Sequence, residues 1–140
     1  MATPTNTQFS VAAHVMTYLA AADGRAVGAT ELAASANVNP VHVRKVLGPL
    51  RDAGLLASTA GRSGGWRLAC DPRTTTLADV WAVVQGDDPV LGLHGPSPDC
   101  PVGRQVAADL GAVERRVAAA VRDELARTTV ADLGSAVPVG

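Results

Sequence analysis

The first part of the chain has apolar residues at helical spacing. Between residues 9 and 22 they recur at i, i+3, i+4 and i+7, which places them on one face of an amphipathic helix. This face consists of Ala12, Val15, Met16 and Leu19. Asp23 and Gly24 follow, and a turn there ends the element. The pattern predicts a first helix over residues 9–22, preceded by a loose arm at 1–8.

Two further helices are predicted after this turn. Thr30 can cap a short helix that ends at Asn37, a residue that tolerates the left-handed conformation. Asn39 is a strong N-cap for a third helix over residues 39–54, and Pro40 suits the first helical position. The inward stripe of this third helix consists of Val43, Val46, Leu47 and Leu50.

A glycine-rich hairpin follows the third helix. The segments LLAST (55–59) and WRLAC (66–70) have the composition of short strands, and AGRSGG between them is typical of a hairpin loop. Alternation along the second strand puts Trp66 and Cys70 on one face and Arg67 on the other. The face that carries the tryptophan is expected to point toward the core.

The C-terminal half contains one short and one long helix. Thr76 and Asp79 have the spacing of a capping box before a helix that stops at Gly86. Residues 87–101 are rich in proline and predicted to be irregular. From residue 102 to about 128 a narrow apolar stripe predicts one long helix, and such a stripe suits a seam against its copy in a second chain better than packing on its own domain. The stripe consists of Val106, Leu110, Val113, Val117 and Val121.

The composition supports a packed core. Hydrophobic residues make up 47% and charged residues 18% of the 140 residues, which is not the composition of a disordered chain. No apolar run approaches the roughly 18 residues of a membrane span, and the first residues lack the regions of a secretory signal. We therefore expect a cytoplasmic protein without membrane association.

Basic residues are concentrated in the middle of a chain whose formal net charge is −1. Residues 42–73 contain six basic against two acidic side chains, a net charge of +4, so the rest of the chain carries −5. A polyanion would be attracted to this segment and repelled elsewhere, which orients an encounter. Ordinary scatter of surface charge explains the same counts equally well, so charge alone does not decide the function.

Three helices followed by a basic hairpin fit duplex DNA. A helix can enter the major groove and bring its first turn to the base edges, while Arg62 on the hairpin can pair with phosphate or enter the minor groove. Trp66 anchors the hairpin in preference to stacking on a base, because duplex bases are not available for stacking. Arg67 is either a phosphate contact or a solvated strand charge. The candidate DNA-binding residues are Asn39, Val41, His42, Arg44, Lys45, Arg62, Ser63, Gly64 and Arg67.

These elements predict a mainly α chain with a small β-hairpin wing. The expected architecture is a winged helix-turn-helix plus a long C-terminal dimerisation helix. We divide the chain into a flexible N-terminal arm at 1–8, a winged-helix DNA-binding domain at 9–86, a sensor-type loop at 87–101, and a dimerisation helix with a C-terminal turn at 102–140.

The chain resembles the Rrf2 family of bacterial transcriptional regulators. The similarity covers TQFSVAAHVMTYLA, ELAASANVNPVHVRKVLGPLRDAGLL and the hairpin GRSGGWRLA, as well as TLADVWAVVQG and the long helix ending in TTVADL. The resemblance implies DNA contacts from Val41 to Lys45 and from Gly61 to Gly65. It also implies a homodimer, crossed through the long helices, on a roughly palindromic operator, where most members of the family repress.

The number of cysteines determines whether an iron–sulfur cofactor is expected. Many Rrf2 proteins hold an iron–sulfur cluster on three cysteines of the loop before the long helix, whereas this loop contains only Cys100. Clusters are usually held by thiolates alone, so His94, Asp99 or a partner residue would have to complete the set, and we predict no cofactor and no metal. Cys100 is then a thiol sensor or an ordinary loop cysteine, and a small effector between the domains is a third option. Cys70 is expected to be a small buried residue.

The sequence therefore predicts a DNA-binding transcriptional regulator, a homodimeric repressor on double-stranded DNA, and not an enzyme. Nothing pairs Cys100 with an identifiable base for a redox or nucleophilic role, and no phosphate loop or nucleophile elbow is present. The alternative is a winged-helix protein–protein interaction module that does not bind DNA and docks through the long helix. The operator, the target genes, the inducing signal and the direction of regulation stay open.

Overall fold

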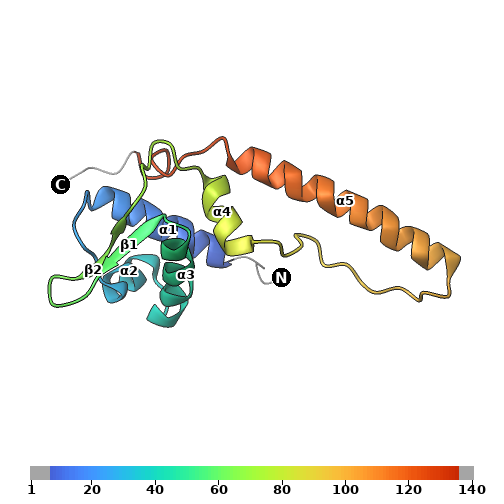
Figure 1. The fold of residues 1–140 in the computed structure, drawn as a ribbon, viewed down its shortest axis with the longest axis horizontal. Helices are drawn as coiled ribbons and strands as arrows, with labels where there is room; N and C mark the ends of the chain where they lie inside the picture. The colour runs from blue at the N-terminus through green and yellow to red at the C-terminus, as the bar shows by residue number, and fades with distance from the viewer. Residues whose placement is uncertain (1–6, 136–140) are drawn as a thin grey trace.

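The computed structural model describes residues 7–135, and this part of the chain forms helices and one hairpin (Figure 1). The elements are α1 (Thr7–Ala21), α2 (Ala29–Ala36), α3 (Pro40–Asp52), β1 (Leu56–Thr59), β2 (Gly65–Leu68), α4 (Leu77–Gln85) and α5 (Pro101–Leu125). The predicted class and element order are confirmed, with boundaries shifted by up to three residues. Because α1 begins at Thr7, the last two residues of the predicted arm are helical, and residues 1–6 lie outside the described part.

The apolar core lies between α1, α3 and α4. The predicted inward faces of α1 and α3 are confirmed, because every residue assigned to them is buried. Removing these side chains from water is the main force that holds the helices together. The core includes Ala12, Val15, Met16, Leu19, Val27, Leu32, Val43, Val46, Leu47, Leu50 and Val80.

The short connection between α2 and α3 is set by local capping. Asn37 ends α2 in the left-handed conformation with a φ of 55°. Asn39 caps α3 as predicted, because its side-chain oxygen accepts the N–H of Val41 at 2.9 Å. The prediction that Thr30 caps α2 is wrong: Gly28 occupies the N-cap without a side-chain bond, and Thr30 already lies inside the first turn.

The hairpin of β1 and β2 is attached to the rest of the domain on both sides. Its antiparallel register pairs Thr59 with Gly65 next to the turn. The N–H of Trp66 donates to the carbonyl of Val27 at 2.8 Å, and the N–H of Val27 donates back at 2.9 Å. A Cβ on Gly65, whose φ is +146°, would lie 2.8 Å from the backbone of Val27, so glycine is required for this close approach.

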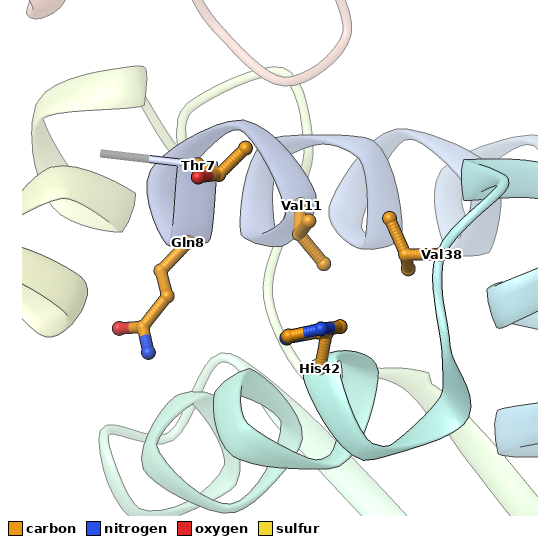
Figure 2. Close-up of a pocket in the computed structure, with 5 residues that line it drawn as sticks. All are labelled: Thr7, Gln8, Val11, Val38 and His42. Atoms are coloured by element: carbon orange, nitrogen blue, oxygen red, sulfur yellow. The ribbon is translucent and has the colours of Figure 1, made fainter. Parts of the chain in front are cut away.

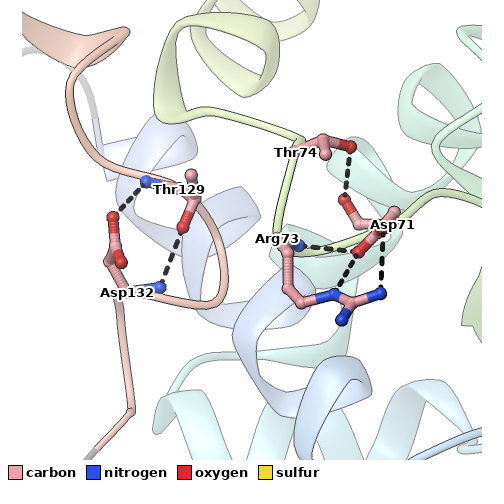
Figure 3. A network of polar contacts seen from close by, with 5 residues as sticks. All are labelled: Asp71, Arg73, Thr74, Thr129 and Asp132. Carbon is pink, nitrogen blue, oxygen red and sulfur yellow. Dashed lines mark hydrogen bonds and ion pairs between the residues drawn. The ribbon is translucent and has the colours of Figure 1, made fainter.

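The connection from β2 to α4 is ordered by Asp71 (Figure 3). Its carboxylate accepts the backbone N–H of Arg73 at 2.9 Å and pairs with the Arg73 guanidinium, while its carbonyl accepts the hydroxyl of Thr74. The bonds from Arg73 to the carboxylate, the backbone one foremost, lower the pKa of Asp71. The predicted capping box of Thr76 and Asp79 then opens α4.

The chain returns to the winged-helix domain after α5. Val130 is fully buried in the core, and its N–H donates to the carbonyl of Thr75 at 2.9 Å. The turn that follows α5 is capped at both ends: the N–H of Thr129 donates to the carboxylate of Asp132, and the N–H of Asp132 donates to the hydroxyl of Thr129 (Figure 3). The turn that follows the long helix is therefore part of the winged-helix domain.

Helix α5 extends away from this domain (Figure 1). Its C-terminal end lies beside α4, and its N-terminal end is the far tip of the molecule. None of its 25 residues is buried within the chain. The loop between α4 and α5 runs out along the helix to the tip, so the helix and the loop form one projecting arm.

Candidate nucleic-acid interface

The first turns of α3 present polar side chains to solvent. His42, Arg44 and Lys45 are exposed, and Val41 is 54% exposed, whereas the opposite face of α3 is buried. Arg44 and Lys45 have no ion-pair partner within residues 7–135. Asn39 is exposed too, but its oxygen caps the helix, which leaves its NH2 group for an outside acceptor. This face can therefore offer hydrogen-bond donors and positive charge to an external anion.

The hairpin tip lies on the same side of the domain as the start of α3 (Figure 1). Arg62 and Ser63 at this tip are both exposed. Gly64 is half-buried, and a Cβ on it would lie 2.2 Å from the carbonyl oxygen of Thr59. Gly64 is thus required to close the turn, and the freely presented side chains of the tip are those of Arg62 and Ser63.

Trp66 packs against the core, as predicted from its place on the strand. The guanidinium of Arg51, near the end of α3, lies 5.7 Å from the centre of its ring, within the range of a cation–π contact. Arg67 lies on the other face of the hairpin, is half-buried, and donates to the hydroxyl of Thr59 at 3.3 Å. Nothing in the sequence pattern indicates the contact of Arg51, because α3 and β2 meet only in the folded chain.

A three-residue polar network fixes α2 against α1. The hydroxyl of Tyr18 donates to Glu31 at 2.5 Å, and Arg25 donates to both oxygens of the same carboxylate, at 2.7 and 3.2 Å. Hydrogen bonds from Arg25 and then Tyr18 lower the pKa of Glu31 to about 2, and the bond to Glu31 raises the pKa of Tyr18. The network connects the helices that position α3, and nothing in the local sequence pattern indicates it.

A pocket of about 190 Å³ lies between the start of α1 and the first turn of α3 (Figure 2). Its lining residues are Thr7, Gln8, Val11, Val38 and His42. Figure 2 shows that the imidazole of His42 faces this space, with Val11 across from it. His42 therefore lies at the boundary between the outer face of α3 and a small apolar hollow.

The two cysteines occupy different environments. Cys100 is exposed at the tip of the projecting arm, where it is the N-cap of α5 and its Sγ accepts the N–H of Gly103 at 3.4 Å. Cys70 lies beyond the end of β2 and is half-buried against the core, so it is less enclosed than predicted. Within residues 7–135 no three His, Cys, Asp or Glu side chains converge on a metal site. One chain therefore supplies a single loop thiolate, which does not fit the donor set of an iron–sulfur cluster.

The side chains of the predicted α5 seam are partly or largely exposed to solvent. Val106 is 36% exposed, and Val102, one turn earlier, is 71% exposed. The remaining seam residues are half-exposed and consist of Leu110, Val113, Val117 and Val121. An apolar row that remains partly exposed along a helix is typical of an interaction surface.

The fold and the two cationic features define a class of protein: a winged helix-turn-helix DNA-binding protein. A model of the Rrf2 family, described as iron-dependent transcriptional regulators, matches residues 5–136. The chain belongs to the Rrf2 family, as its sequence motifs predicted. Within residues 7–135, no helix has the length and hydropathy needed to span a membrane.

Relatives of known sequence and structure agree with this assignment. The HTH-type transcriptional regulator YwnA of Bacillus subtilis is 31% identical over 129 residues, which cover 91% of this chain and 95% of YwnA. CymR of the same organism is 30% identical over 74% of this chain and 69% of its own length. A crystal structure of a transcriptional regulator from Lactobacillus plantarum superposes with a TM-score of 0.78 at 29% identity, covering 93% of this chain and 89% of the other. These relatives carry the names of transcriptional regulators, and the chain is a DNA-binding transcriptional regulator.

Proposed function

We propose that the chain acts as a homodimeric repressor on a palindromic operator. Each protomer places the start of α3 in the major groove and its hairpin tip against the neighbouring backbone or minor groove. The observation that carries the proposal is a set of exposed cations without an ion pair in residues 7–135, at the start of α3 and on the hairpin tip, two features on one side of the domain: Arg44, Lys45 and Arg62. Their charge is available to phosphates because no acidic side chain in residues 7–135 is bonded to it.

The contacting residues divide into two groups. His42 and Arg44, with Asn39 and Val41, lie on the exposed turns of α3 and are assigned to base edges, where they determine the preferred sequence. Lys45, Arg62, Ser63 and Arg67 are assigned to phosphates, which position the protein without reporting sequence. Gly64 contributes the shape of the tip.

The homodimer is proposed to form through α5. Its apolar row is at least partly exposed over the length of the projecting arm, and a second copy supplies an identical row. Twofold symmetry would also explain a palindromic operator, because two identical half-sites match two identical winged-helix domains. Residues 9–86, with the turn after α5 packed on them, then form the DNA-binding domain, and the helix of the 102–140 segment forms the dimer interface. As a regulator of chromosomal genes, the protein is expected in the cytoplasm.

The DNA contacts are tested by fluorescence anisotropy on the DNA upstream of the protein's own gene. Operator affinity should fall with salt by about 0.9 log unit per log unit of salt for each phosphate neutralised. Arg62→Ala should weaken binding and reduce this slope by about 1, whereas Arg44→Ala should change which half-site sequence is preferred. Arg127→Ala is the matched control, since Arg127 is an exposed cation in the segment that follows α5. A slope near zero, or a response of Arg127→Ala equal to that of Arg62→Ala, would contradict the proposal.

A response to redox state or to an effector is proposed for the loop at 87–101. Cys100 is exposed at the arm tip, so oxidants can reach its thiol. The single loop thiolate does not match a cluster, and we propose regulation without an iron–sulfur centre. An ultraviolet–visible spectrum of anaerobically purified protein tests this point, because cluster absorption would contradict it. Operator binding by Cys100→Ser, before and after peroxide, tests the thiol.

A further inference from the structure

Glu114 attaches the α4–α5 loop to the middle of α5. Its two carboxylate oxygens accept consecutive backbone N–H groups, that of Val90 at 2.5 Å and that of Leu91 at 2.8 Å. Hydrogen bonds to a charged acceptor are stronger than neutral ones, and two of them fix both the position and the direction of the loop backbone. All three residues are half-buried, which distinguishes them from the exposed residues around them in the loop and on the outer side of the helix.

The attachment point lies at the border of the apolar seam. With about 100° per residue, the seam from Val106 to Val121 covers about 80° of the α5 surface, and Glu114 lies about 60° from its middle. Gly103, near the tip, lies about 40° from the middle on the same side. A Cβ on Gly103 would lie 3.1 Å from the carbonyl oxygen of Ser97, so the loop remains close to this side of the helix at the tip. The loop therefore follows one border of the seam.

We infer that the α4–α5 loop, held by Glu114, forms one wall of the surface that receives α5 of a second copy of this chain. Val90 and Leu91 belong to that interface, and Glu114 acts as a positioning residue for it. The inference rests on the proposed homodimer and extends it, because the docking surface consists of a helix and a loop and not of the helix alone.

A second copy is the occupant that fits this surface. The seam is apolar along its whole length, and Val90 and Leu91, the loop residues bonded to Glu114 at its border, are apolar as well. The carboxylate of Glu114 is directed at the loop backbone and not at the middle of the seam, because both its oxygens accept backbone donors from Val90 and Leu91. An identical helix offers the complementary apolar row, whereas duplex DNA would need cations that the seam lacks.

The experiment compares Glu114→Ala with Asp109→Ala in the full-length chain. Asp109 is a carboxylate on the same helix, but its partner is Gln105 of α5 and not the loop. Hydrogen exchange of the Val90 and Leu91 amides reports attachment of the loop, and sedimentation equilibrium reports the dimer dissociation constant. Glu114→Ala should accelerate both amides by at least tenfold and raise the dissociation constant by at least tenfold, while Asp109→Ala changes neither.

Val90→Pro removes one donor from the loop side and leaves α5 intact. It should raise the dimer dissociation constant, as Glu114→Ala does. The double variant should raise it little further, because both changes release the same attachment. If the wild-type chain dimerises and Glu114→Ala releases the loop without changing the dissociation constant, the inference is wrong and the homodimer stands. If the wild-type chain is monomeric at micromolar concentration, the proposed homodimer is wrong, and this inference with it.

Discussion

Val130→Ala tests whether the turn after α5 is part of the winged-helix core. Val130 is 0% exposed, although it follows a helix in which no residue is buried. Alanine removes two buried carbon groups, worth about 0.8 kcal/mol each in transfer free energy. A cavity left by incomplete relaxation brings the expected loss in the free energy of unfolding to about 2–3 kcal/mol. At roughly 4 °C per kcal/mol, the Tm should fall by about 8–12 °C.

The assay is urea unfolding at fixed protein concentration, followed by circular dichroism and by the fluorescence of the two tryptophans, Trp66 and Trp81. Val41→Ala is the matched control, since it makes the same change at a side chain that is 54% exposed and lies outside the α5 seam. The control should shift the free energy of unfolding by no more than about 0.5 kcal/mol. Equal effects of the two variants, or an unchanged midpoint for Val130→Ala, would refute the claim that the turn packs in the core.

Two further predictions concern the parts that position α3 and the hairpin. The pKa of Glu31 is about 2 in the folded chain against a usual 4.5, so its stabilising contribution is present above pH 4.5 and lost as the pH falls toward 2. Glu31→Gln should lower the urea midpoint at pH 6, and the difference in midpoint between wild type and variant should be smaller at pH 3. If this difference does not depend on pH, the charge of the carboxylate is not what stabilises the fold. Gly65→Ala puts a methyl group against the backbone of Val27, so it should lower the free energy of unfolding by more than about 1 kcal/mol and weaken operator binding. Gly28→Ala is the control, because a Cβ there meets nothing within 4 Å, and it should have neither effect.

Local signals were sufficient to predict the elements of this fold. Asn39 and the Thr76–Asp79 pair cap their helices through bonds that span two or three residues, so their effect is visible in the sequence. The inward faces follow from helical periodicity in the same way. Thr30 does not cap α2, because the helix begins directly after the pairing of Val27 with Trp66, with Gly28 as its N-cap, and not at the residue best suited to capping.

The rest of the architecture depends on pairs that are distant in sequence. Val27 pairs with Trp66, and Val130 enters the core beside Thr75, yet neither pairing leaves a trace in composition or spacing. Glu114 resembles any other charged residue of a long helix until the loop is placed beside it. The outward side chains of α3 and the hairpin tip were predictable, because exposure there is the complement of a periodic buried face. Their individual DNA contacts remain predictions.

The attachment at Glu114 divides the loop into two parts with different freedom to rearrange. From Leu91 the chain has nine residues in which to reach Cys100 at the tip, while α5 covers the 13 residues from Glu114 back to Pro101. That helical distance is about 20 Å, and nine extended residues reach at most about 30 Å. The outer part of the loop therefore has slack and can change shape around Cys100 without displacing the helix tip. The inner part of the loop consists of only a few residues between the end of α4 and the point of attachment to Glu114. It has much less slack, so a displacement of this part would also displace α4.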